Sequence, residues 1–377
     1  MKARIVQLAF AAATTAAVLG SVIPAHADDA SVAYPAGAVY AATNGIDRNE
    51  VWAYLRSADG TLKLFGKYET GGRGSGGAID PLQSQNSIVL GPNHRYLFVA
   101  NSGSGEISEF LVDRYGGLNL TDCQPSGGGF PNGIAVHNNL VYVLNAGGAG
   151  NVTGFSLRDG QLIRIPGGTH PLTATSAGGS SITFSPDGST LMVTERLTNK
   201  IDVFTLGPTG AITNAAANVS HGDVPFSSIS TPQGAFVVAE AAGNPAGGAA
   251  ISSYTVGADD ILDLVTGSLP TDFNAACWIA DTSDGKYAFA ANAGSSEITT
   301  AGIEPSGALT ILSAASAGTG ATPLDLSVTD DNHYVYALTA GDGTITGFKI
   351  GDDGALTLVT AVQSIPAASG QNGIAAY

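Results

Sequence analysis

The stretch SSITFSPDGSTLMVTERLTNKIDVF, residues 180–204, decides the fold. Ile182 and Phe184 alternate with polar neighbours, which predicts a half-buried strand. The Pro-Asp-Gly sequence that follows is typical of a tight turn, and the apolar run Leu191–Val193 predicts a second strand behind it. A third strand is predicted from Ile201 onward. The stretch therefore predicts three antiparallel strands joined by short turns.

This unit recurs along the chain, and a recurring unit of this size indicates a repeat architecture. Copies of the strand pair and its turn occupy residues 87–101, 133–145, 181–195, 227–240, 278–292 and 325–339. A turn followed by Leu or Ile marks a further strand in each unit, at Leu62, Leu118, Leu162, Ile212, Ile261, Leu309 and Leu356. Four-stranded propeller blades repeat every ~40–50 residues, which is close to the spacing of these marks.

One copy of the unit is split between the two ends of the chain. Gly373–Ala376 is predicted as its inner strand and Val39–Thr43 as its second strand. Pairing of these segments would close the ring without free inner edges. The sequence therefore predicts an all-β fold, a seven-bladed β-propeller of four-stranded antiparallel blades, in a single domain over residues 28–377.

The first 27 residues predict export. A short basic start precedes an apolar run over residues 5–19, and Ala25-His26-Ala27 is typical of a cleavage site for a signal peptide. No later apolar run reaches the ~18 residues that a membrane helix needs. We therefore expect cleavage of residues 1–27 and a secreted or periplasmic protein without membrane insertion.

Charge and composition limit the kinds of molecule that we expect the protein to bind. Without residues 1–27 the chain has 13 basic and 31 acidic residues, a net charge of −18. Such a chain repels nucleic acid and anionic lipid, so we expect neither as a partner. The sequence has no His/Cys cluster or Asp-rich loop with the spacing of metal ligands, so we expect no metal and no cofactor. We expect a monomer that binds a small molecule or a carbohydrate.

Cys123 and Cys277 fall on distant blades of the predicted ring. A disulfide needs α-carbons within about 7 Å of each other. We therefore expect no bridge between them.

The segments YLFVANSGSGEISEF (96–110) and LVYVLNAGGAGNVTGF (140–155) resemble the lactonase-type seven-bladed propellers, also called YVTN-repeat proteins. The resemblance extends over essentially the whole chain after residue 27. It includes bacterial 6-phosphogluconolactonases and fungal carboxymuconate-lactonising enzymes, and so implies hydrolysis or lactonising isomerisation at the mouth of the central channel. Many exported proteins share such repeats, so the resemblance is specific for the fold rather than for one function.

Alignment of the repeats places one residue of each blade at the entrance of its inner strand. These residues are Asn372, Asn86, Asn132, Ser180, Phe226, Cys277 and Leu324. Three neighbouring blades contribute Asn and the others small or apolar groups, as in a ligand site with an apolar wall and few polar groups. We predict ligand contacts from Asn86, Asn132, Asn372, Phe226, His221 and Trp278. The alternative is that the Asn side chains cap the turns where the strands start.

Charged residues gather over blades four and five. Glu195 and Glu240 end the second strands of these blades, and Arg196, Lys200 and His170 accompany them. We predict these five as catalytic residues, because lactone chemistry needs a group that takes the proton and a cation that holds the oxyanion. The alternative is a solvated network of ion pairs on the rim.

The sequence departs from the family pattern beside this sector. The Pro-His-x-His segment of the lactonases reads Ala177-Gly178-Gly179-Ser180 here, so its histidines are absent. Their Asp-Leu-Gly-x-Asp-Arg segment reads Glu-Arg-Leu-Thr-Asn-Lys at residues 195–200, where Lys200 offers a point charge in place of a guanidinium fork. Two functions therefore remain open: an exported lactonase-like enzyme, and a non-catalytic extracellular propeller that binds carbohydrate or protein.

Overall fold

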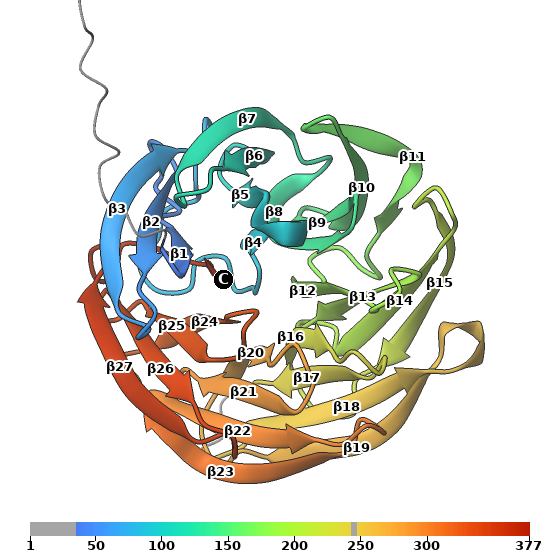
Figure 1. The fold of residues 1–377 in the computed structure, drawn as a ribbon. Helices are drawn as coiled ribbons and strands as arrows, with labels where there is room; N and C mark the ends of the chain where they lie inside the picture. Colours follow the sequence, from blue (N-terminus) through green and yellow to red (C-terminus); the bar gives the residue numbers. More distant parts are fainter. Residues whose placement is uncertain (1–34, 243–246) are drawn as a thin grey trace, which may run out of the picture. The chain divides into compact units, whose positions relative to one another are not determined.

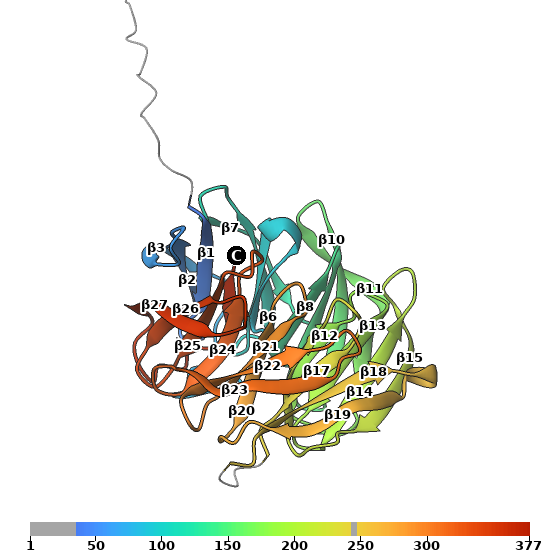
Figure 2. The same ribbon diagram turned by 60° about the horizontal axis from the view of Figure 1, so that its bottom comes forward.

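The computed structural model of the chain describes residues 35–242 and 247–377. The predicted signal peptide lies outside the described residues. Seven antiparallel sheets of four strands each stand around a central axis, as Figure 1 shows along the axis and Figure 2 shows obliquely. The structure confirms the predicted seven-bladed propeller.

Within each blade the strands follow one another from the axis outward. Blade one contains β28 (Ile374–Ala376), β1 (Gly37–Ala42), β2 (Glu50–Arg56) and β3 (Leu62–Glu69). Blade two contains β4 (Ile88–Leu90), β5 (Tyr96–Asn101), β6 (Glu106–Val112) and β7 (Leu118–Pro125). Blade three contains β8 (Gly129–His137), β9 (Leu140–Gly147), β10 (Asn151–Arg158) and β11 (Gln161–Pro171). Blade four contains β12 (Gly179–Phe184), β13 (Thr190–Glu195), β14 (Lys200–Leu206) and β15 (Ile212–Val219).

The remaining blades repeat the same order. Blade five contains β16 (Pro225–Ser230), β17 (Phe236–Glu240), β18 (Ala250–Val256) and β19 (Leu262–Pro270). Blade six contains β20 (Ala276–Asp281), β21 (Tyr287–Asn292), β22 (Glu297–Ile303) and β23 (Leu309–Gly318). Blade seven contains β24 (Pro323–Val328), β25 (Tyr334–Thr339), β26 (Thr344–Ile350) and β27 (Leu356–Gln363). Two 3₁₀ turns, η1 (Pro92–His94) and η2 (Ala258–Asp260), lie in connections.

The C-terminal strand closes the ring. β28 pairs with β1, and Tyr40 lies opposite Ala375 in the register. Arg56 on β2 donates a hydrogen bond from Nε to the carbonyl oxygen of Tyr377, over 3.0 Å. The split copy of the repeat is thus assembled from both ends of the chain.

Tyrosine side chains join neighbouring blades. In three blades a tyrosine in the second strand donates its hydroxyl to a glycine carbonyl in the next blade: Tyr40 to Gly116 (3.1 Å), Tyr142 to Gly210 (2.5 Å) and Tyr336 to Gly60 (2.8 Å). Each of these glycines has a φ near +80°, a conformation that glycine adopts without a steric penalty. The turns that mark the fourth strands in the sequence are therefore also contact points between blades.

A second contact between blades lies at the ends of several second strands. Thr70 at the outer edge of blade one donates its hydroxyl to Asn101 Oδ1 of blade two over 2.7 Å. Thr271 donates likewise to Asn292 Oδ1 over 2.9 Å. Thr173 donates to Glu195 in the same way. We call this arrangement the latch.

The latch of blade four contains two buried carboxyl groups. Glu195 has no exposed surface and Asp202 is 3% exposed. Burial raises the pKa of Asp202 to about 8, and the hydrogen bond and charge of Glu195 act in the same direction. Burial also acts to raise the pKa of Glu195, but hydrogen bonds from Thr173, Thr198 and Asp202 outweigh it and lower that pKa. The pair therefore holds one proton near neutral pH, and Asp202 carries it.

Asp202 occupies the position of a hydroxyl group in other blades. In blade five, Ser252 lies two residues into the third strand and donates to Glu240, as Asp202 does to Glu195. A protonated carboxyl group supplies the same donor. The second carboxyl group thus fits the latch only while it is protonated.

We expect the Asp202→Asn variant to match the wild type in melting temperature at pH 5 and to exceed it by several degrees at pH 8.5. The folded state holds a proton on Asp202 up to about pH 8, whereas the unfolded chain loses it near pH 4. The unfolded state therefore binds fewer protons between these values, and stability falls as pH rises through this window. Each unit of pKa difference corresponds to about 1.4 kcal/mol. Thermal melts at both pH values measure the difference.

Asp202→Ser, which restores the hydroxyl of the other blades, serves as the second variant. If each variant differs from the wild type in melting temperature by the same amount at pH 5 and at pH 8.5, Asp202 does not titrate in the latch.

Deletion of Gln371–Tyr377 should abolish the cooperative melt or cause aggregation. The deletion removes β28 and leaves the inner edge of β1 unpaired. A thermal melt of the truncated chain measures the effect, with Tyr377→Ala as the control that keeps β28. A truncated chain that melts like the full one would show that ring closure is dispensable.

Candidate functional site

A Gly-rich insertion after β3 crosses the channel. Its residues Ser84–Ser87, which we call the plug, form hydrogen bonds with the inner strands of several blades. Gln85 donates its Nε2 to the carbonyl oxygen of Ile279 in blade six over 2.7 Å and its backbone N–H to that of Ser180 in blade four over 2.9 Å. The plug therefore spans the channel from one side to the other.

Other residues of the plug also form hydrogen bonds with residues around the channel. Ser84 donates its hydroxyl to the carbonyl oxygen of Asn132 in blade three over 2.6 Å and accepts a hydrogen bond from Trp278 Nε1 over 2.9 Å. Ser87 donates to the carbonyl oxygen of Asn372 beside blade one over 3.1 Å. The inner-strand entrances thus lie against the plug rather than along an open channel.

The plug buries most of the residues predicted to contact a ligand. Asn132, Asn372, Phe226 and Trp278 are 5% exposed or less. Asn86 belongs to the plug itself and is half-buried, with its backbone N–H directed to Asp325 Oδ2 at 3.3 Å. These residues form the floor beneath the insertion.

The asparagines of this floor hold the insertion in place. Asn132 donates its Nδ2 to the carbonyl oxygens of Leu82 (3.3 Å) and Gly179 (2.9 Å). Asn372 donates to Asp80 Oδ1 over 3.3 Å and accepts from Ser87. These contacts tie the insertion to the inner strands.

The two histidines of the predicted site lie on the flank of the ring. His170, on the outermost strand of blade three, rests its ring on Phe204 of blade four at 5.1 Å. His221 is exposed and follows β15, the outermost strand of blade four. Neither has a contact with Arg196 within the described residues.

The predicted carboxyl groups have structural contacts. Glu195 belongs to the latch and accepts hydrogen bonds from Thr173 and Thr198. Glu240 is 1% exposed and accepts from Gly222 N–H and from Ser268. Lys200 lies opposite Glu195 in the register, where its charge lowers the pKa of Asp202. The structure does not bring these groups together with the histidines.

Arg196 is the predicted residue that turns toward the channel mouth. Its backbone N–H bonds to the carbonyl oxygen of Gly178 over 3.1 Å, and its side chain passes over that glycine. The side chain is half-buried, and its Nε is buried without a hydrogen-bond partner. Burial lowers the pKa of the guanidinium, and the charge of Asp80 opposes that effect. An arginine in a protein nevertheless stays charged, so a cation without a close ion-pair partner among the described residues remains at the mouth.

Asp80, from the insertion, faces this cation. Burial raises the pKa of Asp80 to about 7, against the opposing effects of the Gln83 N–H, the charge of Arg196 and the Asn372 side chain. The Gln83 N–H donates to Asp80 Oδ1 over 2.9 Å. A carboxyl group with a pKa near 7 can take up and release a proton at neutral pH, as a general base must.

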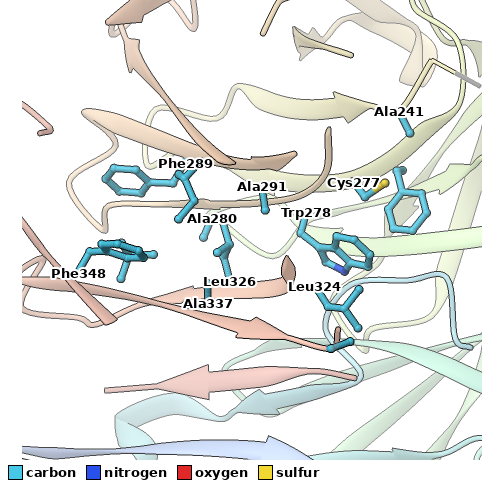
Figure 3. Packing of buried hydrophobic residues seen from close by; sticks show 14 of the residues in the cluster. Ala241, Cys277, Trp278, Ala280, Phe289, Ala291, Leu324, Leu326, Ala337 and Phe348 are labelled. Carbon is cyan, nitrogen blue, oxygen red and sulfur yellow. The ribbon is translucent and has the colours of Figure 1, made fainter. Parts of the chain in front are cut away.

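An apolar wall borders the pair on the side of blades five to seven. Trp278 packs edge-on against Phe226 at 5.2 Å, and Figure 3 shows Trp278 between Cys277 and Leu324. Cys277 is a free thiol, as is Cys123, and burial raises the pKa of Cys277 far above its usual range. The thiol is therefore a small apolar element of the wall.

Sequence reasoning missed Asp80 because the insertion lies outside the repeats. The alignment of blades assigns positions only to residues that recur, and the insertion occurs once. The one available signal was an acidic residue followed by proline, Asp80-Pro81, in a long connection beside an inner strand. Its partner Arg196 comes from blade four, far away along the chain.

Within residues 35–242 and 247–377, no group of three or more His, Cys, Asp or Glu side chains is placed to hold a metal ion. In the same ranges no helix is long and apolar enough to cross a membrane.

Comparison with solved structures gives neighbours of the same fold. A candidate 6-phosphogluconolactonase from Bacteroides uniformis superposes with a TM-score of 0.68 at 17% identity, over 90% of this chain and 99% of that one. The periplasmic gluconolactonase of Pseudomonas aeruginosa gives 0.67 at 16% identity, over 89% and 98%. A protein of unknown function from Desulfotomaculum acetoxidans gives 0.67 at 15% identity, over 89% and 98%.

Comparison by sequence gives the family. No curated protein matches the chain significantly. The sequence profile described as "Lactonase, 7-bladed beta-propeller" matches residues 149–245 and 263–371, which together exceed half of the chain. With seven four-stranded blades and this match, the chain belongs to the lactonase family of seven-bladed β-propellers.

Proposed function

We propose that the protein is an exported lactonase that hydrolyses a small lactone at the channel mouth. The observation that carries this proposal is the half-buried guanidinium of Arg196, without a close ion-pair partner, facing a carboxyl group whose pKa is about 7. Family membership and the periplasmic gluconolactonase among the structural neighbours support the reaction class and the location. The signal sequence at residues 1–27 supports export.

In the proposed reaction Asp80 is the general base. Its carboxylate accepts a proton from a water molecule as the water oxygen attacks the lactone carbonyl carbon. The carbonyl electron pair moves onto oxygen, and Arg196 holds the resulting oxyanion. Collapse of this intermediate breaks the bond to the ring oxygen, which takes the proton back from Asp80 and leaves an open hydroxy acid. The reverse sequence would close the ring.

The other charged residues predicted from the sequence have supporting roles in this proposal. Glu195 fixes the start of the loop that carries Arg196, because its carboxylate binds both Thr173 and Thr198. Glu240 fixes the corresponding loop of blade five through Gly222. We assign no direct contact with the substrate to Lys200, His170 or His221.

The insertion favours a second candidate, the non-catalytic binding propeller. The plug leaves no open passage beneath Asp80 and Arg196, so a ligand would rest on the surface of the mouth. A surface site of this kind also suits a carbohydrate or a protein partner. An activity assay separates the two candidates.

Arg196→Gln should lower kcat/KM for a lactone by about 10²–10³, the usual effect of removing a group that stabilises an oxyanion. Asp80→Asn should lower it by about 10²–10⁴, because the base is lost. A panel of small lactones, assayed by release of acid with purified protein, measures both effects. Arg158→Gln and His333→Asn, on exposed residues of the far face, are the matched controls and should keep wild-type rates.

If the wild-type protein hydrolyses none of the lactones but binds a sugar or a protein, the binding propeller is the function. If both variants keep wild-type activity, the mouth is not the active site.

The pH profile tests the role of Asp80 directly. The carboxylate is the active form, so kcat/KM should rise about tenfold per pH unit below pH 7 and level off above about pH 8. Spontaneous lactone hydrolysis also rises with pH and is subtracted with a protein-free blank. A wild-type profile that stays flat between pH 5 and pH 8 would rule out Asp80 as the base.

A further inference from the structure

The channel forms a second cavity on the face opposite the mouth. It has a volume of about 380 Å³ and lies between the inner strands of blades two to six. His137, Ser185 and Pro186, at the far-face turns, line its rim, and Asn86 of the plug lies at its inner end. Because the plug closes the other side, the cavity is a blind pocket.

The wall of this pocket combines polar and apolar groups in similar measure. Its apolar part comes from Ile134, Val136, Ile182, Phe184 and Ile229. Pockets of ≈300–1,000 Å³ are typical of small-molecule sites. The size of the pocket and the mixture of groups in its wall therefore suit a compact ligand that has both a polar and an apolar part.

The hydroxyl groups of the wall already form hydrogen bonds with neighbouring residues. Thr183 donates to the carbonyl oxygen of Ser228 over 3.0 Å, and the two hydroxyls lie 2.8 Å apart. Their hydrogen-bonding capacity is largely used within the wall. A ligand that needs these hydroxyls would have to break existing contacts.

Asp281 differs from these groups. It ends β20, lines the cavity, and has no hydrogen bond or ion pair with another residue of the described ranges. Burial raises the pKa of Asp281 to about 7, and the charge of Asp284 acts in the same direction. By solvent accessibility the Asp281 side chain is half-buried. Partial burial weakens the hydration of its carboxylate, and a cation at this position would offset that loss.

We propose that this blind pocket binds a small organic ammonium ion, with Asp281 as its counter-ion and the isoleucine and valine side chains of the wall beside its alkyl group. The chemistry of the wall selects this class. A metal ion would need several ligands, and no group of three metal-ligating side chains occurs in the described residues. A neutral alcohol would leave the carboxylate without a counter-charge, and a carboxylate ligand would be repelled by it.

The site is independent of the mouth. The plug separates Asp281 from Arg196 and Asp80, and the pocket opens on the face that carries the Pro-Asp-Gly turns. The proposal therefore does not depend on lactonase activity.

Titration calorimetry with three probes of one alkyl length tests the proposal: n-butylammonium, n-butanol and n-butyrate. The protein comprises residues 28–377, at pH 8, where the carboxyl group is ionised, and about 0.15 M salt, where diffuse attraction to an acidic surface is screened. We expect saturable one-to-one binding of n-butylammonium, at least tenfold weaker binding of n-butanol, and no binding of n-butyrate.

Two variants and a control locate the site. Asp281→Asn should weaken n-butylammonium binding at least tenfold, and Ser230→Phe, which fills the pocket, should abolish it. Asp284→Asn, on the neighbouring turn and paired with Lys286 at 2.8 Å, should bind like the wild type. A thermal melt confirms that each variant is folded.

Three results would overturn the proposal. They are no saturable binding of n-butylammonium, equal binding of n-butylammonium and n-butanol, and unchanged binding by folded Asp281→Asn.

Discussion

The contact between neighbouring blades is the interaction on which the whole structure depends. A four-stranded sheet has two apolar faces to cover, and only the adjacent blades can cover them. The tyrosine hydroxyls of blades one, three and seven and the latches at the ends of the second strands fix the distance between blades. The pairing of β28 with β1 lets this chain of contacts close on itself. Without closure, two blades would each lose one of their neighbours.

The latch explains why the carboxyl groups of Glu195, Glu240 and Asp202 are buried. Blades two, three and six use a neutral amide at the latch, from Asn101, Asn145 and Asn292. Blades four and five use Glu195 and Glu240, and each carboxylate is surrounded by hydroxyl or N–H donors. Asp202 replaces one such donor and keeps its proton as a consequence. The acids of this sector are therefore parts of the scaffold that carries Arg196.

The plug divides the channel into two environments. On one side, Asp80 and Arg196 lie at a mouth whose floor is filled by asparagine and aromatic side chains. On the other, Asp281 lines a blind pocket whose wall combines polar and apolar side chains. Asp325 lies between them with no exposed surface, and burial raises its pKa to about 7. A single insertion thus divides one channel into two separate spaces.

The sequence by itself determined the number of blades, the order of the strands and the closure of the ring. These follow from the period of the apolar pattern and from turns such as Gly116-Gly117, which are local properties of the chain. It also indicated Arg196, because the residue after the second strand of a blade must lie on the face of the channel mouth. Only the tertiary structure decided the rest. Whether Glu195 faces solvent or Thr173 depends on the packing of blade three against blade four, and the meeting of Asp80 with Arg196 depends on the path of an insertion that no repeat predicts.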